Sequence, residues 1–325
     1  MAARSQNVKN VVRVNATCID VTSSNTIEFG YIDELAYPGR IIAGRHRLHR
    51  PLPGSASRAG SGSCGSSLWR ADSLWSRDPV MIELLDPAIA EDAALAAVFE
   101  SEARAARAVS SPFVSQVIDA GVESRTPYLV TELVSGETLA DRLAARRRPS
   151  FPDFVRLFRE LARGVEALHA GGLLHRDLRS ERVLLLSTPA ARGCEQPKLT
   201  LGISKLMNDT LELVRTMAHR AVAPPATLQY TSPEQVLGTA PLSSASDAWS
   251  LAVIAFECVT GELPFTGATT GEQLVQICTA PARVPSEVVE VPGGFDAWFA
   301  RGVEKEAQAR WLSVREMADA LAALR

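Results

Sequence analysis

The chain has 325 residues, of which 46% are apolar and 22% are charged, and it carries a formal net charge of −3. This length suffices for one two-lobed unit or two small domains, and the nearly neutral charge gives no support for a nucleic-acid partner. Five cysteines without paired spacing argue against a disulfide framework or a zinc site, and the lack of an apolar signal segment or a membrane-length span favours a cytoplasmic protein without a membrane anchor.

Residues 1–44 are predicted to form an N-terminal extension. They mix one β-like stretch, Val11 to Val21, with polar residues. Disorder, an added strand and a misassigned start codon all remain open for this segment.

Residues 45 to about 133 are predicted to form short strands around one helix. The runs Val80 to Ile82 and Tyr128 to Thr131 are typical of strands. Ala93 to Val109 is predicted to be helical, because Leu95, Val98 and Ala105 recur at helical spacing.

From about residue 134 to residue 325 the pattern becomes helical. Apolar residues recur with helical spacing from Phe154 to Leu168, behind a predicted N-cap at Ser150 with Asp153 three residues later. Further helices are predicted at Ser246 to Val259, Gly271 to Cys278, Phe295 to Val303 and Val314 to Leu324. The sequence therefore predicts an α+β fold with two lobes, a small β-rich lobe over residues 45–133 and a larger α-helical lobe over residues 134–325.

An ordered set of motifs in the second half resembles bacterial serine/threonine protein kinases. His175 to Arg179 reads H-R-D-L-R and resembles the catalytic loop of that family. Downstream, Tyr230 to Gln235 is similar to the A-P-E element, and Ser246 to Leu251 resembles the buried helix whose Asp, here Asp247, holds the catalytic loop.

The resemblance implies a protein-kinase-like domain over residues 45–325 with a known set of pairings. Arg310 is expected to pair with Glu234 of the A-P-E element, and Glu102 is expected to be the ion-pairing glutamate of the small-lobe helix. Asp177 falls at the position of the catalytic base, and Arg179 replaces the lysine that usually follows it.

The resemblance also implies the residues that would face a nucleotide. They are Gly60, Gly62 and Gly65 of a G-x-G-x-x-G pattern, with Met81, Glu83, Glu102, Glu132, Val134 and Leu184. For the glycine pattern, a flexible insert rich in Gly and Ser is an alternative interpretation.

Several residues that phosphoryl transfer needs are replaced. Glu83 stands where the family has its phosphate-binding lysine, and Met81 replaces the alanine above the adenine ring. Arg182 and Thr200 replace the Asn and Asp that bind magnesium, so no metal site is expected. The carboxylates of Glu83 and Glu102 would face one another as like charges.

Three functions remain open from the sequence. The first is a pseudokinase, a scaffold or allosteric partner of other proteins such as an active kinase or its substrate, with weak or no nucleotide binding and no cofactor. The second is an unconventional serine/threonine kinase that uses Asp177 with ATP and Mg²⁺. The third is a nucleotide sensor without turnover.

Overall fold

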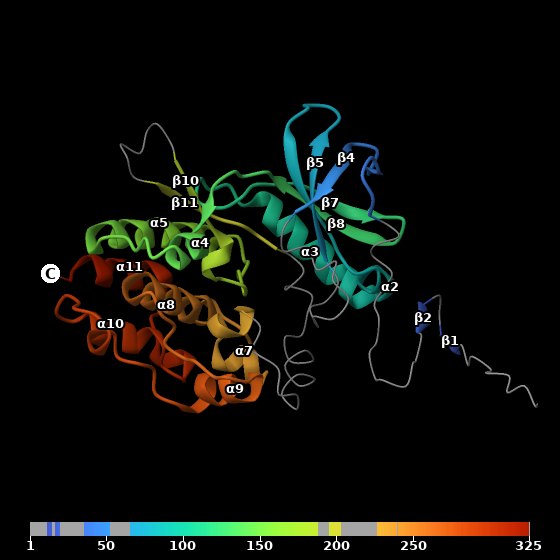
Figure 1. Ribbon diagram of the computed structural model, residues 1–325. Coiled ribbons are helices and arrows are strands. Elements are labelled where there is room, and N and C mark those ends of the chain that lie inside the picture. Colours follow the sequence, from blue (N-terminus) through green and yellow to red (C-terminus); the bar gives the residue numbers. More distant parts are fainter. Residues whose placement is uncertain are drawn as a thin grey trace, which may run out of the picture.

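The computed structural model describes residues 12–14, 17–19, 36–52, 66–187, 195–202, 226–238 and 240–324. Figure 1 shows a lobe built around a β-sheet, with α3 beside it, and a lobe built from helices. The α+β fold with two lobes predicted from the sequence is therefore confirmed. Gly60, Gly62 and Gly65 lie outside the described residues.

The small lobe is a sheet of six strands in the order β3-β4-β5-β6-β8-β7, in which every neighbouring pair is antiparallel. The strands are β3 (Ile41–Ile42), β4 (His46–Pro51), β5 (Ser67–Ser73), β6 (Pro79–Leu84), β7 (Val117–Glu123) and β8 (Thr126–Glu132). Met81 lies opposite Arg70 on one side and Thr131 on the other, so these three side chains share a face of the sheet. Alternate residues such as Val80 and Ile82 are buried in the lobe's own core.

Two helices accompany this sheet, α2 (Ala88–Glu91) and α3 (Ala93–Ala108). The helix α3 begins behind Asp92, whose side chain accepts hydrogen bonds from two backbone N–H groups of the first turn. Its buried face carries Phe99, Ala103 and Ala106.

The apolar spacing proposed for α3 was partly wrong. Leu95 is 36% exposed and Val98 is 43% exposed. The aromatic ring of Phe99 defines the buried face, because a large ring gains more from burial than a short aliphatic side chain.

The large lobe contains α4 (Leu139–Ala144), α5 (Phe151–Ala170), α7 (Pro233–Leu237), α8 (Ser244–Thr260), α9 (Thr270–Thr279), α10 (Phe295–Gly302) and α11 (Val314–Ala322). The predicted cap of α5 is confirmed, since Ser150 Oγ accepts a hydrogen bond from Asp153 N at 3.3 Å. The helix α8 is buried along most of its length and packs against α5, α10 and α11 (Figure 1). This helix therefore lies at the centre of the large lobe's core.

Two smaller sheets complete the described structure. The strands β9 (Glu137–Thr138), β10 (Val183–Leu186) and β11 (Gln196–Leu199) form a sheet in the order β11-β10-β9 next to the catalytic loop. In the N-terminal extension, β1 (Val12–Val14) pairs with β2 (Thr17–Ile19). No helix in the described parts of the chain is both long and apolar enough to cross a membrane.

Candidate active site

Asp247, near the start of α8, accepts hydrogen bonds from the loop that carries the H-R-D sequence. Its Oδ2 accepts hydrogen bonds from His175 N at 2.9 Å and from His169 Nε2 at 2.7 Å, and its Oδ1 accepts from Arg176 N at 2.9 Å. The carboxylate is 1% exposed, so these charge-assisted bonds form away from solvent. The structure thus places Asp247 in the scaffold role expected for it.

Asp247 stabilises an unusual backbone conformation. Arg176 has φ = 61°, in the left-handed region that costs a residue with a side chain about 1 to 2 kcal/mol. The hydrogen bond from Arg176 N to Asp247 fixes the peptide in this orientation. Gln235 of α7 adds a second restraint, because its Nε2 donates to Arg176 O at 2.9 Å.

Asp177, at the expected position of the catalytic base, lies between two arginines. Its Oδ1 accepts from Arg179 Nε at 3.1 Å and its Oδ2 accepts from Arg182 Nε at 3.2 Å. The Asp177 side chain is 3% exposed, so both contacts are largely shielded from solvent. Each carboxylate oxygen therefore has a cationic donor within the protein.

Arg182 is fixed by the segment that replaces the D-F-G element. Thr200 N donates to Arg182 O at 2.8 Å, and Thr200 Oγ1 donates to the same carbonyl at 3.3 Å. A Cβ on Gly202 would lie only 2.7 Å from Arg182 Nη2, so the guanidinium fills the space beside this glycine. Burial would lower the pKa of Arg182, but the carboxylates of Asp177 and Glu83 raise it above its ordinary value.

The residues present do not fit the magnesium ions that a kinase uses. The Arg182 guanidinium has five N–H donors and no lone pair for a cation, and the Thr200 hydroxyl is directed to a backbone carbonyl. In the described residues there is no group of three or more His, Cys, Asp or Glu side chains that would hold a metal. Among the expected catalytic and metal-binding positions, Asp177 keeps its carboxylate.

Two acidic residues of the small lobe, Glu83 and Glu102, lie in different electrostatic surroundings. Glu102 on α3 pairs with Arg176 of the catalytic loop, with Oε1 and Nη2 3.2 Å apart. Glu83 on β6 is 4% exposed and acts electrostatically on Arg182. The structure thus gives Glu102 an ion pair with an arginine from the other lobe, and the like-charge encounter of Glu83 with Glu102 stays a prediction.

The remaining nucleotide-facing positions lie where the lobes meet. Val134 is the second residue after β8, and Leu184 lies in β10 opposite Lys198. Glu132, at the end of β8, accepts from Gln116 N at 2.8 Å and pairs with Lys198 Nζ at 2.5 Å. Sequence reasoning missed Lys198 as a member of this group, since the two residues lie 66 positions apart in strands of different sheets.

A second polar cluster missed by sequence reasoning joins the catalytic loop to α8. The hydroxyl of Tyr230 donates to Glu257 Oε2 at 2.7 Å, and Ser180 Oγ donates to Glu257 Oε1 at 3.3 Å. Burial, together with the nearby carboxylate of Glu181, raises the pKa of Glu257 to about 7. The cluster couples the loop to the central helix through a group that titrates near neutrality.

This raised pKa predicts a pH-dependent stability. The unfolded chain loses the Glu257 proton near pH 4.5, whereas the folded protein retains it to about pH 7, so the free energy of unfolding falls as the pH rises through this interval. In Glu257→Gln we expect that fall to be smaller by about 2 kcal/mol. The full pKa shift corresponds to a larger change, which we reduce because the Glu257 side chain is partly exposed.

The measurement is urea unfolding at a series of pH values from 4 to 8 for the wild type and for Glu257→Gln. Glu262→Gln is the matched control, because that carboxylate pairs with Arg283 at the surface. Parallel stability profiles for the wild type and Glu257→Gln would contradict the assignment of this titration to Glu257.

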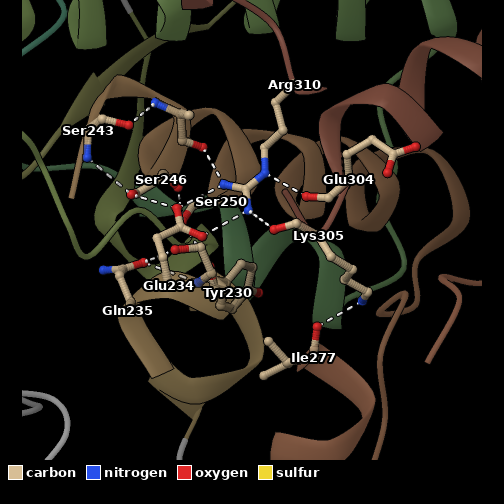
Figure 2. A network of polar contacts seen from close by, with 12 residues as sticks. Tyr230, Glu234, Gln235, Ser243, Ser246, Ser250, Ile277, Glu304, Lys305 and Arg310 are labelled. Atoms are coloured by element: carbon tan, nitrogen blue, oxygen red, sulfur yellow. Dashed lines mark hydrogen bonds and ion pairs between the residues drawn. The ribbon is translucent and has the colours of Figure 1, made fainter. Parts of the chain in front are cut away.

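The A-P-E element is anchored by a buried ion pair (Figure 2). Arg310 Nη1 and Nη2 donate to Glu234 Oε1 and Oε2, each at 2.8 Å, and Ser246 Oγ also donates to Oε1 at 2.7 Å. Burial would raise the pKa of Glu234, but the hydrogen bonds from Arg310 and Ser246 hold it below its ordinary value. The pairing of Glu234 with Arg310 expected from the sequence is present.

Arg310 uses every one of its donors. Besides Glu234, its guanidinium donates to the backbone carbonyls of Ala245, Glu304 and Lys305, at 2.9, 2.7 and 3.1 Å (Figure 2). Its Cζ lies 5.0 Å from the centroid of the Trp249 ring. With 1% of the residue exposed, Arg310 is a structural connector between α7, α8 and the segment before α11.

Comparison with known proteins agrees with this geometry. The protein kinase domain model matches residues 57–303. The chain is 32% identical over 292 residues to the serine/threonine-protein kinase pkn2 of Myxococcus xanthus, covering 89% of this chain and 33% of that protein. It is 30% identical to the serine/threonine-protein kinase PknA of Mycobacterium tuberculosis, covering 88% of this chain and 63% of PknA.

The fold has a counterpart among solved structures. The crystal structure of the Mycobacterium tuberculosis PknI kinase domain superimposes with a TM-score of 0.65 at 21% identity, covering 88% of this chain and 98% of that chain. The chain spans a third of pkn2 and less than two thirds of PknA. From the family match over residues 57–303 and the ordered motifs, we conclude that the chain belongs to the bacterial serine/threonine protein kinase family.

Proposed function

We propose that this chain is a pseudokinase, a kinase-fold module that acts on other proteins as a scaffold or allosteric partner and transfers no phosphate. The observation that carries the proposal is the position of Asp177 between Arg179 and Arg182, with Nε–carboxylate distances of 3.1 and 3.2 Å. A substrate hydroxyl would have to compete with a guanidinium for either oxygen of this carboxylate.

The surroundings of Asp177 support the same function. Phosphoryl transfer depends on a lysine and magnesium ions that neutralise the charge developing on the transferred group. Here Glu83 supplies a negative charge at the position of that lysine, and Arg182 and Thr200 supply no metal ligand. By contrast, the residues that hold the fold, Asp247 and the Glu234–Arg310 pair, keep their partners.

A phosphate-transfer assay tests this proposal. Purified protein is incubated with radiolabelled ATP and a general protein substrate, with Mg²⁺ in one series and Mn²⁺ in the other, next to an active kinase as positive control. We expect no transfer above the level of Asp177→Asn in either series. Transfer that is present in the wild type and lost in Asp177→Asn would refute the pseudokinase function.

A serine/threonine kinase activity is the second candidate. It is favoured by the retention of Asp177 in a loop whose backbone is held by Asp247, and by the kinase names of the relatives pkn2 and PknA. ATP and Mg²⁺ would be its cofactors, and Arg179 and Arg182 would then have to neutralise the phosphates. The transfer assay separates it from the first candidate directly.

Protein partners are part of the proposal. In a family whose substrates are proteins, an active kinase or one of its substrates is the expected class of partner for an inactive member. Such a partner would contact the catalytic loop and α3 and would respond to their conformation.

A further inference from the structure

An open hollow of about 270 Å³ lies on the sheet of the small lobe and is lined by His49, Arg50, Arg70 and Asp72. These residues belong to the paired strands β4 and β5 (Figure 1). A shift in register between Leu48 and Arg50 leaves His49 without a directly opposite residue on β5. Three of the four lining residues thus carry basic side chains.

The two arginines of the hollow face each other across the strands. Arg50 is paired with Arg70 in the β4–β5 register, and both residues are exposed. Like charges at directly opposite positions repel each other and destabilise a strand pair. Within the described parts of the chain, neither guanidinium forms an ion pair with a carboxylate. The arrangement therefore holds a positive charge that a bound anion would neutralise.

The acidic residue of the hollow has a different partner. Asp72 Oδ2 lies 2.7 Å from His49 Nε2, and both side chains are 42% exposed. Among the residues that line the hollow, this is the ion pair that Asp72 forms, and it includes neither arginine. The charges of Arg50 and Arg70 therefore remain uncompensated at this surface.

The sequence around the hollow is strongly basic. From Leu35 to Ala71 it contains six Arg and no Asp or Glu, although the whole chain has a net charge of −3. A long polyanion such as nucleic acid would meet the acidic remainder of the chain, whereas a short anion would meet only the local positive charge. The hollow is also small, since ligand pockets for whole small molecules measure roughly 300 to 1,000 Å³. Its size and charge suit a single compact anionic group.

We propose that this hollow binds the phosphate group of a phosphorylated serine or threonine side chain on a protein partner. Such a group carries a charge of about −1.5 to −2 near neutral pH, which matches the two guanidiniums of Arg50 and Arg70. Each guanidinium can donate two parallel hydrogen bonds to phosphate oxygens. This deepens the proposed function and rests on it, since the partners expected there are an active kinase, which produces phosphorylated side chains, or one of its substrates, which carry them.

The first test measures the binding of a probe to the full chain by fluorescence anisotropy. The probe is a fluorescein-labelled peptide of alanine and glycine with one central phosphothreonine, compared with the same peptide carrying unmodified threonine. We expect the wild type to bind the phosphorylated peptide at least about tenfold more tightly than the unmodified one. Arg50→Gln and Arg70→Gln should each weaken that binding at least about tenfold, because each removes charge-assisted hydrogen bonds to the phosphate.

Arg159→Gln is the matched control, because it removes the same charge from an exposed position on α5 of the large lobe. We expect it to change the affinity less than about twofold. Equal binding of the two peptides, or equal losses in Arg70→Gln and Arg159→Gln, would overturn the site. Inorganic phosphate with the same dissociation constant as the peptide, or a poly-uridine oligonucleotide that binds more tightly than the peptide, would overturn the assignment to a protein partner.

The second test uses inorganic phosphate as the probe and the melting temperature as the readout. In chloride buffer, Arg70→Gln should melt no lower than the wild type, because it removes the like-charge repulsion across the strands. Replacing chloride with phosphate at constant ionic strength should raise the melting temperature of the wild type more than that of Arg70→Gln. A lower melting temperature of Arg70→Gln in chloride, or an equal rise in phosphate, would contradict an uncompensated charge at the hollow.

The binding assay and the transfer assay distinguish this inference from the proposed function. Selective binding of the phosphorylated peptide together with phosphate transfer by the wild type would refute the pseudokinase function and support the phosphate site. The absence of selective binding together with the absence of transfer would refute the phosphate site alone.

Discussion

Replacing Arg310 with glutamine should lower the free energy of unfolding by about 3 to 5 kcal/mol, one of the two largest single effects that we expect in this chain. The change leaves the Glu234 carboxylate buried without its bidentate partner and leaves three backbone carbonyls with fewer donors. It also removes the cation packed against the Trp249 ring. Chemical unfolding monitored by circular dichroism and tryptophan fluorescence measures the loss.

Arg315→Gln is the matched control for this prediction. Arg315 also forms a bidentate pair, with Glu166 at 2.7 and 3.0 Å, but its side chain is 67% exposed. A surface pair of this kind contributes at most about 1 kcal/mol, so we expect a change below that value. Similar losses in Arg310→Gln and Arg315→Gln would show that burial does not set the strength of the Glu234–Arg310 pair.

Asp247→Ala should have the second large effect, a loss of about 3 kcal/mol or more in the free energy of unfolding, together with a changed catalytic loop. Three donors lose their acceptor at once, namely the backbone N–H groups of His175 and Arg176 and the ring of His169. The left-handed backbone at Arg176 then loses a restraint that holds it in place.

Hydrogen exchange of the loop amides, read by mass spectrometry, detects the second part of this prediction. We expect faster exchange over residues 174–178 in Asp247→Ala than in the wild type, under conditions where both are folded. Asp296→Ala is the control, because Asp296 accepts a single backbone hydrogen bond, from Ser286 N at 3.0 Å, near the surface. Unchanged exchange in the loop would contradict the role given to Asp247.

The sequence was most informative about residues that hold the fold. Asp247, Glu234 and Arg310 occur in motifs with a fixed order, and the contacts expected for them are present. Helices such as α5 and α8 were also predictable within a few residues, because each combines an apolar face or a buried run with a side-chain cap.

The partners of the charged residues in the cleft were much harder to predict. The ion pair between Glu102 and Arg176 joins residues 74 positions apart, and its formation depends on how the two lobes meet. The like-charge encounter of Glu83 with Glu102 followed from family position alone, whereas in the folded chain Glu102 pairs with Arg176. A motif specifies the position of a residue in the fold, whereas the ion-pair partner of its side chain depends on charges contributed by distant segments.

The pairing of Arg182 with Asp177 also bears on how this cleft changes during evolution. Restoring the family's asparagine at position 182 alone would remove one of the two arginines that hold the Asp177 carboxylate, whose side chain is 3% exposed. A metal ion would have to bind in the same step to supply the lost positive charge. A single reversion at this position is therefore destabilising before any gain from a metal can appear.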